Sequence, residues 1–269
     1  MFETDPDVVG VDFSGAKRAG QHIWIAECSS SGELLTVDEC YAAESKVGNE
    51  RDQVLRKLCD AISTAESCTV GLDFPFGVPK AVTEANDWDS FVGEFDYCSP
   101  DQFHEECKNA AEQRCGTSYL QRETEDEVVG GLCSYGWRIR NQTFYGIQSV
   151  LGEILGDVAV PPMHASGDVN VVETYPAATF EHIGAERTGY KGQRQSSHDT
   201  RRTNLETLIQ GGDERNRVEF TSHKLRDYAL CDDNALDAVA CAFAAARAKD
   251  TGFEKCNNHY NPAEGYIYV

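Results

Sequence analysis

The sequence predicts an α/β fold in which helices pack on a mixed β-sheet. Three observations carry this prediction. Hairpin-like apolar segments dominate the chain before residue 75, whereas strand-like and helix-like segments alternate after residue 145. The length of 269 residues, with 41% hydrophobic residues, allows one large core. We therefore expect residues 1–269 to form a single domain.

Five segments have the character of strands, because each is a short apolar run bounded by turn residues such as Ser14-Gly15. They cover residues 8–13, 22–27, 34–41, 69–74 and 169–174, and a serine-rich loop at 29–32 joins the second and third as a hairpin. Helical spacing predicts helices over 50–65, 145–155, 201–210 and 233–249, and Pro176 starts another.

Residues 80–140 differ from the rest, because they are polar, acidic and rich in aromatic residues. Ser99 followed by Pro100 is a helix start, with serine as the N-cap and proline at the first helical position. We predict a helical insertion after the fourth strand. Four of its aromatic residues could serve a partner or a homodimer: Phe91, Phe95, Tyr97 and Phe103.

The net charge of −21 is extreme and constrains the partners. Such a surface repels anionic membranes and, at low salt, nucleic acid, so nucleic-acid binding is opposed by the overall charge. A strongly negative surface also suits concentrated salt, where ions screen the repulsion between like charges. We therefore hypothesise that the protein is halophilic.

Cysteine usage and the N-terminus predict a cytoplasmic protein. The eleven cysteines contain no C-x-x-C pair and do not suggest a disulfide framework. The first seven residues lack a basic and apolar signal, and the apolar run near 238–246 is too short to span a bilayer.

Carboxylates recur at the ends of apolar segments. Asp12 and Asp73 end two similar segments, Val-Gly-Val-Asp-Phe and Val-Gly-Leu-Asp-Phe, and Glu173 ends a third. Unpaired buried carboxylates are costly, and the carboxyl edge of an α/β sheet is where ligands bind. The segment around Asp237 is almost wholly apolar, so this residue should face protein, with Asp233 one turn earlier on the same face.

These five acids predict a site for Mg²⁺ or Mn²⁺, because clustered carboxylates repel one another and offer hard oxygen ligands. Each acid also has a purely structural interpretation. Asp12 or Asp73 alone could cap a turn, Glu173 could pair with an arginine, and Asp233 could cap the last helix. Asp237 has no capping role available.

The motifs resemble those of one widespread prokaryotic family of unknown function, which is described as a predicted nuclease of the ribonuclease H fold. They are Val-Gly-Val-Asp-Phe-Ser-Gly at 9–15, Gly-Leu-Asp-Phe-Pro-Phe-Gly-Val-Pro at 71–79, Val-Glu-Thr-Tyr-Pro-Ala-Ala at 172–178, Tyr-Lys-Gly at 190–192 and Asp-Asn-Ala-Leu-Asp-Ala at 233–238.

The resemblance implies a ribonuclease H-like fold with a mixed five-stranded sheet. It also implies acids at Asp12, Asp73 and Asp237, with Glu173 matching the acid before Tyr-Pro. One departure is Asn234, because the family often carries an aspartate there; Asp233 could substitute for it.

Basic residues are few, so their positions are informative for substrate binding. Candidates for phosphate contacts are Arg122, Arg140, Lys191 and Arg202, and their alternative role is to neutralise neighbouring acids. Another set, Cys98, His104, Cys107 and Cys115, has residue types that fit zinc but spacings of no common zinc motif.

The leading functional hypothesis is a metal-dependent nuclease in which Asp12, Asp73, Glu173 and Asp237 are catalytic. One alternative is a non-catalytic binding protein that keeps the fold, which the net charge favours. The other is an actin-like or sugar-kinase-like enzyme that uses ATP, because 12–15 faintly resembles the phosphate loop of that group.

Overall fold

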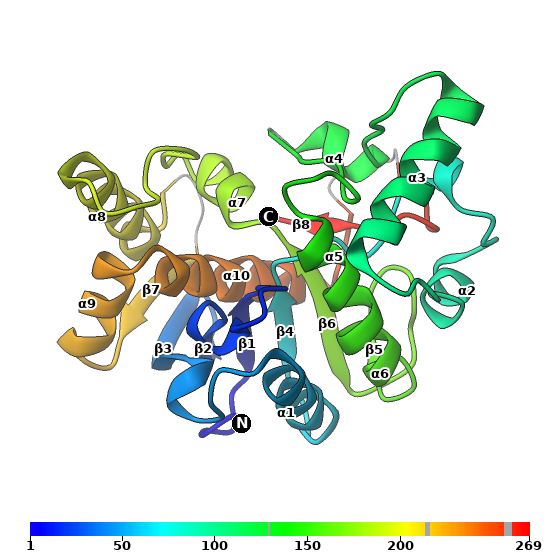
Figure 1. Ribbon diagram of the computed structural model, residues 1–269. Helices are drawn as coiled ribbons and strands as arrows, with labels where there is room; N and C mark the ends of the chain where they lie inside the picture. The colour runs from blue at the N-terminus through cyan, green and yellow to red at the C-terminus, as the bar shows by residue number, and fades with distance from the viewer. Residues whose placement is uncertain (129, 213–215, 256–259) are drawn as a thin grey trace.

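The computed structural model describes residues 1–128, 130–212, 216–255 and 260–269. Within them the fold is a mixed α/β arrangement with one sheet of eight strands, in the order β5-β6-β4-β1-β2-β3-β7, while β8 pairs with β6 (Figure 1). The strands are β1 Val8–Asp12, β2 Trp24–Ser31, β3 Leu34–Ala42, β4 Thr69–Leu72, β5 Val158–Ala159, β6 Val169–Thr174, β7 Arg217–Phe220 and β8 Ile267–Tyr268.

Strand β2 runs antiparallel to both of its neighbours, and the other pairings are parallel. All five predicted strands are present and form the contiguous centre of the sheet, but the predicted number of five is wrong. The three strands that the sequence did not reveal are short, with two to four residues each. The two residues of β5 and of β8 are too few for a periodic signal, whereas β7 is as long as the predicted β4 but carries charged residues at two of its four positions.

Helices cover both faces of the sheet (Figure 1). Strand side chains alternate between the faces, so Val9 and Val11 join one core cluster with helix α1, while Val8 joins a second cluster with helix α10. The helices are α1 Arg51–Ser63, α2 Trp88–Gly93, α3 Pro100–Cys115, α4 Glu123–Glu127, α5 Arg140–Gly146, α6 Gly152–Ile154, α7 Pro176–His182, α8 Gln195–Gln210, α9 His223–Cys231 and α10 Asp233–Asp250, with a π turn at Ile147–Leu151.

The predicted insertion holds α2, α3 and α4, and the Ser99 hydroxyl accepts a hydrogen bond from the Gln102 amide at the start of α3, which confirms the predicted cap. The four aromatic residues singled out above pack against one another, with Phe91 and Phe103 buried and Phe95 and Tyr97 partly buried. Phe103 is fully buried, and the Phe95 ring lies 5.4 Å from it. Because these rings serve the core, they give no support to a homodimer surface.

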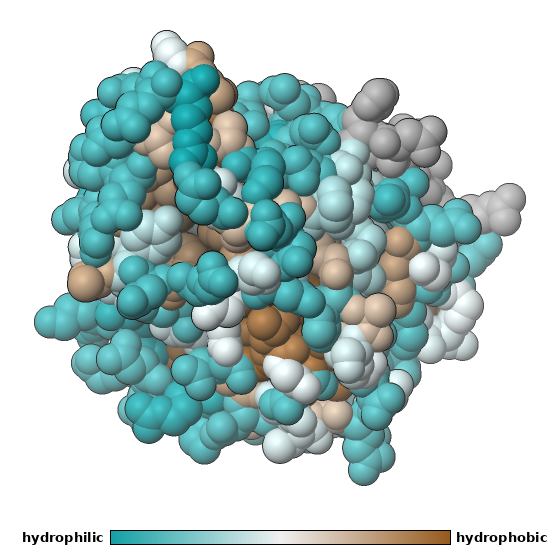
Figure 2. All heavy atoms as spheres, turned by 90° about the vertical axis from the view of Figure 1, so that its right-hand side faces the viewer, coloured by the Kyte–Doolittle hydropathy of each residue, from teal (hydrophilic) through white to brown (hydrophobic). Residues whose placement is uncertain are grey.

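The side of the molecule that carries α2 and α3 is mostly hydrophilic, with one apolar hollow near its centre (Figure 2). Across the described ranges, no helix is both long and apolar enough to cross a bilayer.

Candidate metal centre

Three aspartates from distant parts of the sequence meet at one edge of the sheet. Asp12 ends β1, Asp73 directly follows β4, and Asp237 lies in α10. One carboxylate oxygen of each lies within 4.8 Å of the others, and no other set of three or more metal-binding side chains does so in the described parts of the chain.

Strand pairing explains why Asp12 and Asp73 are neighbours. β1 and β4 are parallel, with Gly10 opposite Gly71, so the residues two positions later lie side by side on the same face. Helix α10 covers that face and supplies Asp237. Its backbone approaches very closely, because a Cβ atom on Gly10 would lie 2.0 Å from the Ala238 carbonyl oxygen.

The three carboxylates are buried or nearly so, and their pKa values are raised. Asp12 is 6% exposed and Asp237 is fully buried. Burial raises the pKa of Asp12 well above its usual range, and the charges of Asp237 and Asp73 raise it further. Burial likewise raises the pKa of Asp73 to about 7. The cluster therefore favours any bound cation that offsets its charge.

Lys191 supplies one such cation. Its Nζ atom lies 2.6 Å from Oδ2 of Asp237, and the side chain is otherwise 58% exposed. The Asp237 carboxylate raises the pKa of Lys191. Neither oxygen of Asp237 accepts a hydrogen bond of regular geometry within the described ranges, so this buried carboxylate depends on the ammonium group.

Arg201 of α8 holds the loop that carries Lys191. Its Nη1 atom donates to the carbonyl oxygens of Tyr190 and Gly192, at 2.7 and 2.8 Å, on either side of the lysine. The guanidinium is 2% exposed. Nothing in the sequence pattern reveals the inward direction of Arg201.

The structure differs from the prediction for Glu173, which it does not bring to the aspartates. In the register of β4 with β6, Glu173 lies opposite Leu72, whose side chain belongs to the other face of the sheet. A shift of one residue along a strand reverses the face of the side chain. Thr174 is therefore the residue of β6 that lies beside Asp73, on the face of the sheet that carries Asp12 and Asp73.

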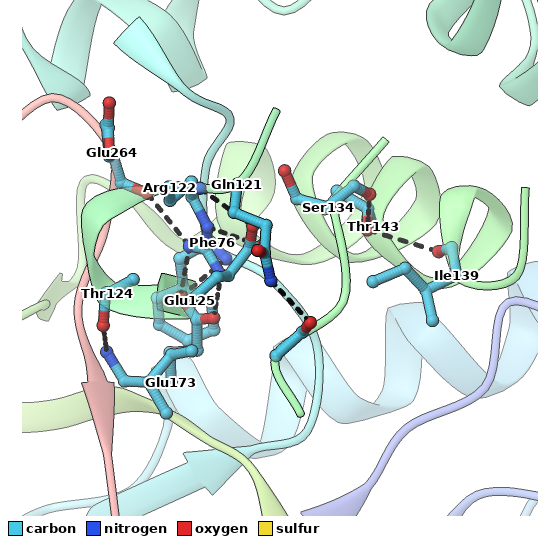
Figure 3. Close-up of polar contacts among 12 residues, drawn as sticks. Phe76, Gln121, Arg122, Thr124, Glu125, Ser134, Ile139, Thr143, Glu173 and Glu264 are labelled. Carbon is cyan, nitrogen blue, oxygen red and sulfur yellow. Dashed lines mark hydrogen bonds and ion pairs between the residues drawn. The ribbon is translucent and has the colours of Figure 1, made fainter. Parts of the chain in front are cut away.

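Arg122 binds Glu173 instead (Figure 3). Its Nη1 and Nη2 atoms donate to the two oxygens of Glu173 at 2.8 and 2.5 Å, and its Nε donates to Glu125 at 2.9 Å. Nη1 also donates to the carbonyl oxygen of Glu264. The arginine is 1% exposed and its donors are taken up by acceptors of the protein, so its predicted contact with substrate phosphate stays a prediction. It joins the insertion, β6 and the C-terminal segment.

Asp233 lies beside the three aspartates but outside their group. It is the first residue of α10, and its Oδ1 atom is 3.9 Å from Arg201. Its charge raises the pKa of Asp12 and of Asp237. The N-cap is Asp232, whose side chain accepts a hydrogen bond from the Asn234 amide, so the predicted metal-ligand role of Asp233 remains a prediction.

The other predicted substrate contacts lie elsewhere. Arg140 forms an ion pair with Asp101 at 2.5 Å and stacks on Trp137, and Arg202 is exposed on α8. The residues suggested for zinc lie in different environments. His104 is buried and contacts the Tyr135 carbonyl oxygen, whereas Cys98 and Cys115 are exposed. They form no metal-binding group among the described residues.

A cavity of about 400 Å³ opens beside Asp73. Its walls come from α4 and the following loop, from β6 and the start of α7, and from the 187–191 loop. Asp73, Lys191 and Arg187 lie in these walls, together with apolar and aromatic side chains. Sequence reasoning missed both the cavity and Arg187, since they depend on loops that meet only in the folded chain.

The comparisons with known proteins agree with the sequence motifs. A family model described as "Protein of unknown function (DUF429)" matches residues 10–264. No curated protein and no solved structure matches the chain. Because the match covers nearly the whole sequence and includes Asp12, Asp73 and Asp237, the chain belongs to this family of unknown function, DUF429.

Proposed function

We propose that this protein is a metal-dependent phosphodiesterase acting on nucleic acid, a nuclease, in which Asp12, Asp73 and Asp237 hold Mg²⁺ or Mn²⁺. The observation that carries the proposal is the convergence of three carboxylates within 4.8 Å, with Asp12 and Asp237 buried and Asp73 partly buried. Turn capping, the alternative for Asp12 and Asp73, does not explain why Asp237 meets them from a helix.

The residues fit a hard divalent cation. All three offer oxygen atoms, which Mg²⁺ and Mn²⁺ prefer. The carboxylate of Asp237 is buried and is met by the Lys191 ammonium at one oxygen only, so its second oxygen could serve as a metal ligand. Bound there, such a metal would polarise a phosphate group and lower the pKa of water.

The surrounding residues support the same chemistry. Lys191 places a positive charge at the mouth of the site, where it can attract a phosphate oxygen. Arg201 fixes the backbone on both sides of that lysine. Arg122 orients Glu173 and so fixes the end of β6, which forms part of the cavity wall.

The fold assignment within this proposal is ribonuclease H-like. It is supported by the five central strands in the order β3-β2-β1-β4-β6, with only β2 antiparallel to its neighbours within this set, and by an acid at the end of β1. We further propose that residues 1–269 form one domain and that the protein acts in the cytoplasm. The ten described cysteines are free, in keeping with a reducing compartment.

The test is hydrolysis of labelled single-stranded and double-stranded DNA and RNA, with EDTA, Mg²⁺ or Mn²⁺. We expect cleavage that requires metal and that is lost in Asp73→Asn while the far-UV and near-UV circular dichroism stay unchanged. Asp227→Asn is the matched control, since this exposed carboxylate of α9 lies outside the cavity wall. Full activity of Asp73→Asn would overturn the proposal.

A second candidate function is a non-catalytic binding protein. The ion pair between Lys191 and Asp237 favours it, because a lysine already offsets part of the charge of the cluster. Calorimetry with Mn²⁺ separates the two: binding that Asp12→Asn abolishes supports the nuclease, whereas absence of binding supports the second candidate. The ATP-using alternative has no observation in its favour beyond the faint resemblance of residues 12–15 to a phosphate loop.

A further inference from the structure

The cavity beside Asp73 has the size and lining of a site for one small ligand. Its volume of about 400 Å³ lies in the range of pockets that enclose small molecules. A double helix could not enter a space of this size. A ligand that reaches Asp73 through the cavity must therefore be a small molecule or a single unpaired residue of a strand.

The walls are suited to a flat apolar group. Pro75, Leu132, Ile139 and the partly buried Tyr175 line them with accessible surface, and the buried side chains of Phe74, Pro176, Tyr190 and Ile267 lie behind these. Rings and aliphatic side chains of this kind stack on nucleobases, which all offer a π-face. A sugar phosphate without a base would leave this apolar surface uncovered.

The aromatic walls are held in place by their own contacts. The Tyr175 hydroxyl donates to the Gly130 carbonyl oxygen at 3.1 Å, and the Tyr190 ring lies 5.1 Å from that of Phe180. The Phe74 ring lies 4.6 Å from Phe13 and 5.0 Å from Phe76. The cavity is thus formed before any ligand arrives, which lowers the entropic cost of binding.

Three cations line the cavity: Arg122, which is paired with the lining carboxylates of Glu125 and Glu173, and two others that mark where an anionic group would lie. Lys191 stands between the cavity and the aspartates, and Arg187, whose Nε is 3.2 Å from Glu181, lines the same cavity. A phosphate joined to a base in the cavity could reach Lys191 and the aspartate cluster together. Additional phosphates would meet a protein of net charge −21, which disfavours long polyanions.

From these features we infer that the cavity binds one nucleobase with its phosphate, so that the substrate is a nucleotide or the unpaired terminal nucleotide of a strand. This inference rests on the proposed function for the chemistry at the aspartates, but base binding itself does not require metal. The same chemistry is offered by a free nucleotide and by a strand end, and the experiment separates these sources.

The experiment is calorimetry on the full chain in EDTA, with AMP, GMP, CMP and UMP titrated separately and ribose 5-phosphate as the ligand without a base. We expect at least one nucleotide to bind about tenfold or more tightly than ribose 5-phosphate, since stacking a base contributes about 1–3 kcal/mol. Equal affinity for all five ligands would overturn the inference.

The matched variants are Ala177→Phe and Ala110→Phe. Ala177 lines the cavity at the start of α7, whereas Ala110 of α3 lines a different hollow, and both alanines are partly buried. The first should weaken nucleotide binding about tenfold or more, and the second should not. Equal weakening by both, or by neither, would contradict the assignment.

A second arm compares the best mononucleotide with an eight-residue single strand and a blunt hairpin ending in the same nucleotide. Tighter binding of the mononucleotide would identify a free nucleotide as the ligand, and tighter binding of the single strand would identify the end of a strand. Preference for the hairpin would overturn the inference. These titrations contain no metal. Failure of Mn²⁺-dependent cleavage would therefore contradict the proposed function and leave the inference of base binding unaffected.

Discussion

The carbonyl oxygen of Ala238 in α10 occupies the space where a Cβ atom on Gly10 of β1 would lie, at 2.0 Å. Gly71, opposite Gly10 in β4, is similarly close to the Cys241 carbonyl oxygen, at 2.6 Å. This pair of glycines lets the helix backbone rest directly on the sheet. The distance of Asp237 from Asp12 and Asp73 is therefore set by two residues that carry no functional group.

Substitution of Gly10 by alanine should separate α10 from the sheet. We expect a loss of unfolding free energy of about 1–3 kcal/mol or more, as for other overpacked cores, together with weaker Mn²⁺ binding. Denaturant unfolding and calorimetry measure the two effects. Gly93→Ala is the control, because a Cβ on this helical glycine would meet no atom within 4 Å. Equal stability of both variants would refute the packing argument.

Asp73→Asn should stabilise the protein without metal while it abolishes metal binding. The pKa of Asp73 is raised to about 7, above that of an unfolded chain, so the native state holds the extra proton between about pH 4 and pH 7. Stability should therefore fall as pH rises through this window, and the asparagine variant should remove that fall. At pH 8 we expect a gain on the order of 1 kcal/mol.

Thermal unfolding of both proteins from pH 4 to pH 8 in EDTA measures this effect. A buried hydrogen bond made only by the carboxylate would produce the opposite slope, and that result would contradict the proposed repulsion. Mn²⁺ affinity of the unaltered protein should rise over the same interval, because the ligands must lose protons before they bind.

Lys191→Gln should make the protein more dependent on metal. Removal of the ammonium leaves the buried Asp237 carboxylate without its ion-pair partner; because solvent screens the half-exposed lysine, we expect a loss between that of an exposed and that of a buried pair, about 1–3 kcal/mol. Mn²⁺ should then raise the melting temperature more than it does in the unaltered protein. Lys57→Gln, which removes an exposed ion pair with Asp60, is the control. A melting temperature insensitive to Lys191→Gln would show that the pair does not stabilise the cluster.

Arg122→Met should be among the most damaging single changes. It would leave Glu173 and Glu125 buried and unpaired, so we expect a loss of about 3–5 kcal/mol. Arg202→Met, on the exposed surface of α8, should change stability by less than about 0.5 kcal/mol. Urea unfolding compares the two, and similar midpoints would mean that the Arg122 network contributes little.

Salt should stabilise this protein. With a net charge of −21, self-repulsion is long-ranged at low ionic strength, and the Debye length falls from about 10 Å at 0.1 M to about 3 Å at 1 M. We expect the melting temperature to rise between about 0.1 M and 2 M KCl. A flat or falling profile would remove the support for a halophilic protein.

The sequence alone determined the elements that have strong local signals. Five of the strands, the cap at Ser99 and the apolar helix with its buried Asp237 are all visible in hydrophobic patterns and turn residues. The same patterns placed Asp12 and Asp73 at strand ends, since an acid that closes an apolar run is itself a local signal.

Tertiary structure decided which acids meet. Glu173 stands at a strand end as the aspartates do, but the register of β6 turns it to the opposite face, where Arg122 binds it. Lys191 and Arg201 acquired their roles because a loop and a helix far from the aspartates fold over them. Local patterns fix the direction of a side chain only relative to its own strand, whereas register and helix packing, which depend on distant residues, fix its neighbours.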